Sequence, residues 1–197
     1  MTDTANPEQM LFASTTQTFL EKQASLAHLR SLHDAGVSFE QQWWQSAAEL
    51  GWASLLVPEE LGGGSVSGDG LADLALVAEK AGRTVAPGPL HPVSTVLAGL
   101  VEAPDGHEDS IAALVSGELV ASWAVYEPRR GFEPLQTGIA TAARRTDSGY
   151  RLDGVKDRVE AGAGCGALLV VAECDGALRQ FLVPTDAAGL TVTAQES

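Results

Sequence analysis

The chain has few cysteines, few basic residues and no long apolar run, and each shortage excludes a class of protein. Cys165 and Cys174 are the two cysteines among 197 residues, and they form neither a metal-ligand pattern nor a disulfide framework. Twelve Lys and Arg against 26 Asp and Glu give a net charge of −14. This balance argues against nucleic acid and anionic membrane surfaces as partners, since both need a basic surface. No apolar stretch approaches the roughly 20 residues of a membrane span.

The first residues hold neither the basic segment nor the apolar core of a signal peptide. We therefore expect a cytoplasmic protein with no membrane and no nucleic-acid partner. Its length suits one large domain or two small ones, and a hydrophobic share of 45% is normal for a globular protein.

Residues 1–118 show the spacing of helices. Asn6, Pro7 and Gln9 have the pattern of a capping box with proline at the first helical position. Ser38 with Gln41 repeats the capping-box pattern before a second helical segment. Expected helices start at Asn6 and at Leu26, run from Ser38 to Gly51 and from Asp69 to Gly82, and cover 91–100 and 109–115.

After Glu118 the period changes to two or to continuous apolar runs, which is typical of strands. Asp175-Gly176 between two such runs predicts a hairpin. Helices first and strands afterwards indicate an α+β fold: an N-terminal helical bundle over 1–118 and an antiparallel β-domain over 119–197. The expected strands are 120–126, 138–144, 167–172, 178–183 and 190–194.

The segment Trp123–Phe132 is an apolar strand that ends in a Glu-Pro-x-x-Gly turn. Pro128 lacks an amide donor and fixes its own φ, so the strand stops there, and Gly131 allows close approach of a ligand. The glycine-rich run 162–167 has a loose dinucleotide-binding spacing, but a strand follows it where a helix is needed. No arrangement of histidines predicts a metal site, and no catalytic triad can be assembled.

Several segments in collinear order resemble the acyl-CoA dehydrogenase family. Residues 49–63 contain Leu-Gly-Trp and then Val-Pro-Glu-Glu-x-Gly-Gly, as in that family's N-terminal helical domain. Glu127-Pro128-x-x-Gly131 lies where the family has its flavin-contacting loop. Segments 78–83, 139–144, 150–156 and 168–172 follow in the family's order. The resemblance implies a helical domain, a β-domain at the flavin ring and a second helical domain, which is absent from this sequence.

The resemblance also implies the chemistry. FAD is the implied cofactor and an acyl-CoA thioester the implied substrate; in α,β-desaturation a base removes the α-proton and a hydride leaves the β-carbon. No catalytic base and no metal ligand is assigned within this chain. By its matching positions, the resemblance places Trp123, Val125, Tyr126, Arg158, Val159 and Glu160 at the flavin, and Gly131 and Phe132 at the substrate.

Three positions depart from the family pattern and leave two hypotheses open. Tyr126, Arg158 and Glu160 stand where the family has a hydroxyl residue, a tryptophan and a threonine. In the first hypothesis the chain is part of a flavoenzyme of fatty-acid or sterol side-chain catabolism, which the intact Glu127-Pro128 favours. In the second it is a degenerate subunit without flavin, as in actinobacterial heteromeric members. Both imply a homo- or hetero-oligomer with an acyl-CoA dehydrogenase-like chain.

Overall fold

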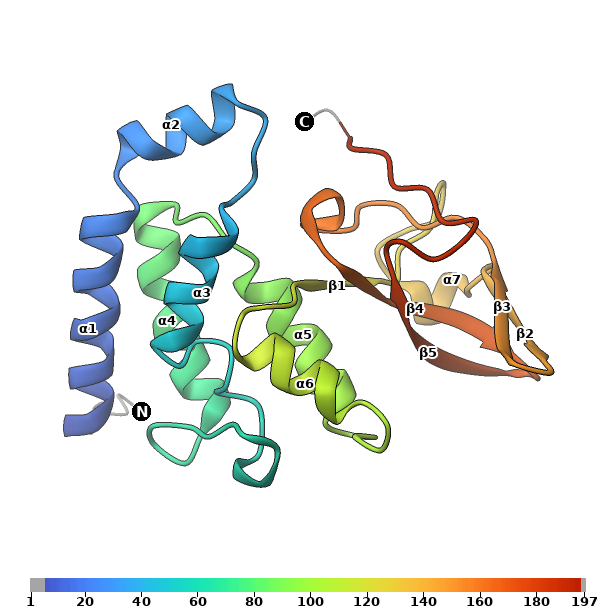
Figure 1. The fold of residues 1–197 in the computed structure, drawn as a ribbon, viewed down its shortest axis with the longest axis horizontal. Helices are drawn as coiled ribbons and strands as arrows, with labels where there is room; N and C mark the ends of the chain where they lie inside the picture. The colour runs from blue at the N-terminus through green and yellow to red at the C-terminus, as the bar shows by residue number, and fades with distance from the viewer. Residues whose placement is uncertain (1–5, 196–197) are drawn as a thin grey trace. The chain divides into compact units, whose positions relative to one another are not determined.

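A computed structural model describes residues 6–195 (Figure 1), and the chain divides into two compact units, residues 1–119 (unit 1) and 120–197 (unit 2). Unit 1 is helical, and unit 2 contains a sheet. The α+β class predicted from the sequence is therefore confirmed. The helices of unit 1 are α1 (Pro7–Gln23), α2 (Leu26–Asp34), α3 (Gln41–Glu49), α4 (Gly70–Thr84), α5 (Leu90–Leu100) and α6 (Glu108–Val115), with a 3₁₀ turn, η1 (Glu59–Leu61).

The helix boundaries confirm one predicted capping box and correct another. At α1 the Asn6 side chain accepts from the Gln9 amide at 2.8 Å, and the Gln9 side chain accepts from the Asn6 amide at 3.1 Å. The box predicted at Ser38 is wrong. Glu40 precedes α3 with no side-chain cap, and the Gln41 side-chain amide instead donates to the Gly117 carbonyl.

Helix α4 also continues past the glycine that was predicted to end it. Gly82 lies inside α4, and the left-handed residue after the helix is Val85, with φ of 52°. A glycine tolerates helical backbone angles, so it ends a helix only where a left-handed conformation is required.

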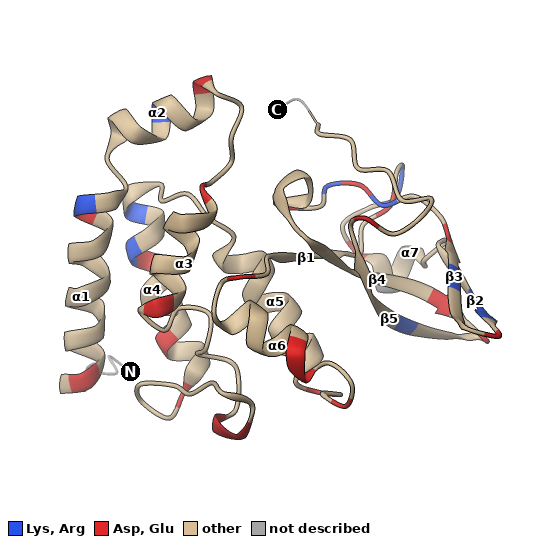
Figure 2. Cartoon of the chain, in the orientation of Figure 1, with Lys and Arg blue, Asp and Glu red and all other residues tan. Residues whose placement is uncertain are grey.

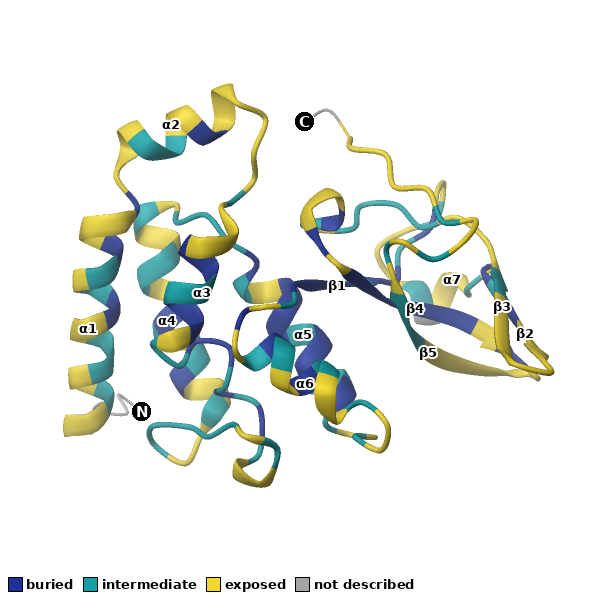
Figure 3. Cartoon of the chain, viewed as in Figure 1, coloured by how far each residue is buried: buried dark blue, intermediate teal, exposed yellow. Residues whose placement is uncertain are grey.

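An aromatic cluster of Phe19, Trp43 and Trp52 joins α1 to α3 and the turn after it. The ring centroids lie 5.4–5.9 Å apart. The Trp52 indole N–H donates to Thr16 Oγ1 at 3.3 Å, and the Trp43 N–H donates to the Gln23 carbonyl at 3.1 Å. Figure 3 shows α5 largely buried, whereas α2 is mostly exposed. The three aromatic rings between α1, α3 and the turn after α3 therefore form the aromatic part of the unit 1 core.

Unit 2 is built around a central strand, β4 (Ala167–Cys174). Strand β5 (Ala177–Pro184) pairs antiparallel with β4 along its whole length, and β1 (Ala121–Ala124) pairs parallel with β4 on its other side. Strand β2 (Ala142–Thr146) meets β4 through one parallel pair and forms an antiparallel hairpin with β3 (Gly149–Asp153). The sheet is therefore mixed, and the expectation of a wholly antiparallel sheet is wrong.

Three other details of unit 2 differ from the sequence prediction. No strand was expected at β3, and no helix at α7 (Pro134–Thr137) between β1 and β2. Residues 190–194, predicted as a strand, have no regular structure. No helical domain follows the sheet within residues 6–195. In the same range, no helix is long and apolar enough to cross a membrane, and no cluster of His, Cys, Asp or Glu is suited to a metal ion.

Candidate functional site

The loop after β1 is organised by the buried carboxylate of Glu127, whose side chain is 4% exposed. One oxygen, Oε2, accepts from the Ala140 amide at 2.7 Å, and the other, Oε1, accepts from the Thr141 amide at 2.8 Å. Oε1 also accepts from Thr141 Oγ1 at 2.6 Å and from Lys156 Nζ at 2.9 Å. The carboxylate thus joins the end of β1 to the segment before β2 and to the segment after β3.

These contacts keep Glu127 ionised. Burial alone raises the pKa of a carboxyl, but the donors from Thr141, Ala140 and Lys156 outweigh it and lower the pKa of Glu127 from 4.5 to about 2. At Lys156 the balance is opposite, because burial lowers its pKa more than the attraction of Glu127 raises it. The pair is thus a buried structural ion pair, and Glu127 is poorly suited to accept a proton near neutral pH.

Three side chains from the loop after β1 and the segment after β3 form a cluster that we call the arginine cluster: Tyr126, Phe132 and Arg158. The Arg158 guanidinium lies 4.5 Å from the Phe132 ring centroid and 5.3 Å from that of Tyr126. The two rings meet edge to face at 5.4 Å. Arg158 Nη2 also donates to the carbonyls of Glu127, at 3.0 Å, and Arg130, at 3.1 Å. The Arg158 guanidinium therefore contacts aromatic rings with its faces and donates hydrogen bonds from its edge.

Backbone contacts bring residues 122–127 alongside residues 156–160. The Asp157 amide donates to the Tyr126 carbonyl at 3.0 Å, and Lys156 Nζ lies 3.3 Å from the Val125 carbonyl. Ser122 Oγ donates to the carbonyl of Glu160. The two segments that the sequence analysis linked to the flavin are neighbours in unit 2.

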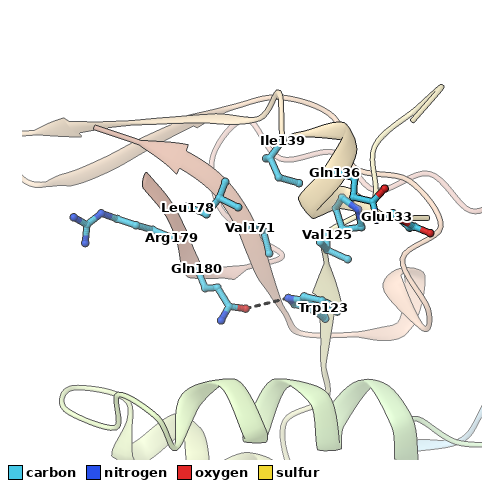
Figure 4. A pocket seen from close by; sticks show the side chains of 10 residues that line it. Trp123, Val125, Glu133, Gln136, Ile139, Val171, Leu178, Arg179 and Gln180 are labelled. Carbon is cyan, nitrogen blue, oxygen red and sulfur yellow. Dashed lines mark hydrogen bonds between the residues drawn. The ribbon is translucent and has the colours of Figure 1, made fainter. Parts of the chain in front are cut away.

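A cavity of about 530 Å³ lies on unit 2, beside β1 and β5 (Figure 4). Its wall is mainly apolar, and Trp123 and Val125 of the predicted site belong to it. The Trp123 indole N–H donates to Gln180 Oε1 at 3.0 Å, which fixes the ring at the cavity rim. The other lining residues are Glu133, Pro134 and Gln136 from α7 and the residue before it, with Ile139, Val171, Leu178 and Arg179.

The predicted site residues thus fall into three groups. Trp123 and Val125 line the cavity, while Tyr126, Phe132 and Arg158 form the arginine cluster. Val159 is half-buried, and Glu160 and Gly131 are exposed. Sequence reasoning did not identify Glu127, Thr141 and Lys156 as one buried unit. The signal for them was weak, since a Glu-Pro pair and a lone lysine are common at turns.

Comparison with known proteins places these features in a family. Residues 6–108, just over half of the chain, match the family model described as "Acyl-CoA dehydrogenase, N-terminal domain". The acyl-CoA dehydrogenase FadE12 of Mycobacterium tuberculosis is 32% identical over 163 residues, which cover 78% of this chain and 41% of FadE12. The chain therefore spans about two fifths of the length of this curated relative.

Two solved structures share the fold of both units. The ChsE4-ChsE5 complex of Mycobacterium tuberculosis matches 99% of this chain and 52% of the other, with a TM-score of 0.84 and 26% identity. An acyl-CoA dehydrogenase complexed with FAD from Bacillus anthracis matches 100% of this chain and 34% of the other, with a TM-score of 0.78 and 27% identity. From the match over residues 6–108 and these likenesses, the chain belongs to the acyl-CoA dehydrogenase family.

Proposed function

We propose that this chain forms the N-terminal and middle-domain part of a subunit in an acyl-CoA dehydrogenase assembly. The assembly would desaturate the α,β-bond of an acyl-CoA thioester from fatty-acid or sterol side-chain catabolism. The observation that carries the proposal is the Glu127 carboxylate, which fixes the loop after β1 in a chain whose helical unit matches the family model. A related protein is known as a complex with FAD, and FAD is the proposed redox cofactor of the assembly.

The side chains of this chain do not fit a flavin ring at the place that the resemblance implies. A planar ring system packs on an open, flat apolar wall. Here the Arg158 guanidinium lies over one face of Tyr126 and one face of Phe132, and it donates to two backbone carbonyls. Trp123 and Val125 lie apart from this cluster, on the cavity.

This disagreement favours a specific role within the family. The chain is then a supporting subunit that contributes shape and contacts to the assembly, while another acyl-CoA dehydrogenase-like chain holds the flavin. The ChsE4-ChsE5 complex, which pairs two different chains, offers a precedent for such an assembly. The alternative is that each copy of this chain holds its own FAD, with Arg158 displaced.

Purification of the chain with its native partners tests both statements. The complex should reduce an artificial electron acceptor when it is given fatty acyl-CoA or sterol side-chain CoA thioesters, with enoyl-CoA as product. An assembly that desaturates none of these thioesters would contradict the proposed activity. The absorbance of flavin per copy of this chain distinguishes the roles: no flavin assignable to this chain supports the supporting subunit, and one flavin per copy supports the alternative.

A further inference from the structure

We infer that Arg158 is a positioning residue that holds the loop 126–132 closed against residues 156–160 and thereby excludes a flavin ring from unit 2. The exclusion of flavin rests on the proposed function, whereas the closure of the loop rests on the geometry alone. Four contacts of Arg158 carry the inference: two carbonyls, two aromatic rings.

The two carbonyls belong to opposite sides of the turn. Arg158 Nη2 lies 3.0 Å from the Glu127 carbonyl and 3.1 Å from the Arg130 carbonyl, so one nitrogen bridges the turn at Pro128 and Arg129. Nε donates to Asp157 Oδ1 at 2.8 Å, which orients the guanidinium plane. An ammonium group would not reproduce this set, because the planar fork of arginine has its donors in fixed directions.

The rings add a second constraint. Phe132 is 68% exposed, yet its face meets the Arg158 guanidinium at 4.5 Å. The same guanidinium lies 5.3 Å from the Tyr126 centroid, within the distance of a cation–π contact. The ring faces that meet inside the loop are therefore occupied by the Arg158 guanidinium, while the rest of the Phe132 ring stays exposed.

The backbone conformation indicates that contacts hold this arrangement. Arg129 has φ of 60° and Arg158 has φ of 51°, both in the left-handed region that favours glycine. Such residues persist where their surroundings determine the conformation. Arg130 supplies a further contact, because its side chain donates to the carbonyls of Thr137 and Gly138 and lies 3.3 Å from Glu127 Oε2.

Trypsin measures the closure directly, because the loop contains its own cleavage sites after Arg129 and Arg130. In the chain purified with its partners, Arg158→Ala should increase the cleavage rate at these two bonds by about tenfold or more. The rate at which trypsin cleaves a loop depends on how often the loop opens. Arg158→Ala opens more often because it loses the two hydrogen bonds that the charged guanidinium donates to the loop carbonyls. Arg158→Lys keeps the charge and should lie between Arg158→Ala and the wild type. Arg151→Ala, at an exposed arginine of β3, is the matched control and should leave the rate unchanged.

FAD binding to the wild type and to a further variant, Arg158→Trp, tests the exclusion. Titration by flavin fluorescence quenching should show weak binding by the wild type and about tenfold tighter binding by Arg158→Trp, which offers a flat apolar face. Equal cleavage rates of Arg158→Ala and Arg151→Ala would overturn the closure. Circular dichroism checks that Arg158→Ala is folded, and Arg158→Lys provides a second, milder variant. A tight FAD site on the wild-type chain itself, counted as flavin bound beyond the sites of the partner chain, would overturn the exclusion. If the wild-type assembly desaturates no acyl-CoA but trypsin cleavage still depends on Arg158, only the proposed function is contradicted.

Discussion

At the scale of single residues, each unit has, within residues 6–195, one buried carboxylate that organises a loop. In unit 1, Asp73 accepts from the amides of Val66 and Ser67, at 2.7 and 2.9 Å, and from the side chains of Gln9 and Ser67, both at 2.8 Å. These donors lower the pKa of Asp73, although burial opposes them. Glu127 does the same for unit 2. Loops that lack regular pairing are thus fixed by charge-assisted hydrogen bonds, which are stronger than neutral ones.

Replacement of Glu127 should destabilise unit 2. Glu127→Gln removes the negative charge and leaves the Lys156 ammonium, whose side chain is 9% exposed, without its partner. Loss of one member of a buried pair costs about 3 kcal/mol or more of the free energy of unfolding. Urea denaturation measures this change. Glu133→Gln, at an exposed glutamate, should stay within about 0.5 kcal/mol of the wild type, and equal effects of the two substitutions would contradict the role of Glu127.

The same carboxylate predicts an acid-sensitive step in stability. The pKa of Glu127 is about 2 in the folded chain against an ordinary 4.5, so the unfolded chain binds a proton first as the pH falls. Its stabilisation is complete above about pH 4.5 and is lost as the pH falls toward 2. Asp73 contributes in the same direction. The free energy of unfolding, measured by urea titration between pH 6 and the lowest pH at which the chain stays folded, should fall more steeply for the wild type than for Glu127→Gln. Parallel curves would contradict this expectation.

At the scale of secondary structure, local signals were read correctly and distant ones were missed. The capping box at Asn6 involves neighbours in sequence, so the sequence was sufficient to predict it. At Ser38 the prediction failed because the Gln41 amide group binds the carbonyl of Gly117, far along the chain. Strand β3 was missed because most of its residues are exposed and show no apolar alternation; its pairing with β2 makes it a strand.

The candidate site divides in the same way. The sequence located the two segments that meet near Tyr126 and Asp157, because motif order shows which segments matter. It did not show that Arg158 would contact Phe132, since that contact depends on where side chains lie in space. Hydrophobic periodicity likewise could not predict that residues of α7 and β5 line one cavity.

Two glycines, Gly154 just after β3 and Gly82 inside α4, should respond to alanine in opposite directions. A Cβ on Gly154 would lie 2.5 Å from Thr141 Oγ1 and 2.7 Å from its Cα, so Gly154→Ala displaces a donor of the Glu127 carboxylate. We expect Gly154→Ala to lower the free energy of unfolding by about 1–3 kcal/mol. Gly82, inside α4, has nothing within 4 Å of an added Cβ, and Gly82→Ala should stabilise the chain by about 0.5–1 kcal/mol. Thermal unfolding of both variants measures the two shifts, and a stabilised Gly154→Ala would contradict the packing described.

At the scale of the whole molecule, charge is divided unequally between the units. Eight of the twelve Lys and Arg residues lie after residue 119, although unit 2 is the shorter unit. Figure 2 shows these cations on β2, β3 and β5 and around the loops of unit 2, whereas acidic residues predominate in unit 1. Unit 2 also holds ten of the 26 Asp and Glu residues, so its net charge is −2 (8 − 10) against −12 (4 − 16) for unit 1, and unit 2 should repel an anionic partner or thioester less than unit 1 does.

The 197-residue chain alone should not dehydrogenate acyl-CoA. Among the described residues, the two buried carboxylates, Asp73 and Glu127, have lowered pKa values and are occupied by donors, so neither suits removal of an α-proton. An acceptor-reduction assay with added FAD should show turnover for the native assembly and none for the chain by itself. Measurable turnover by the isolated chain would refute this prediction.

Association is the second prediction at this scale. Strand β5 pairs only with β4 within the described residues, which leaves one strand edge unpaired beside the apolar cavity. Unpaired edges and apolar hollows favour contact with another chain. Size-exclusion chromatography with light scattering at micromolar concentration should give a mass above 20.5 kDa. A single peak with the monomer mass of 20.5 kDa would contradict the prediction of association.

The aromatic cluster of unit 1 has an optical consequence. Trp43, Trp44 and Trp52 all lie in unit 1, and Trp123 is the remaining tryptophan of the sequence. A Trp123→Phe variant would therefore emit from unit 1 alone on excitation of tryptophan, and subtraction of its melting curve from that of the wild type would isolate the signal of unit 2. The order in which the two units lose their structure becomes measurable in one cuvette, without an added dye.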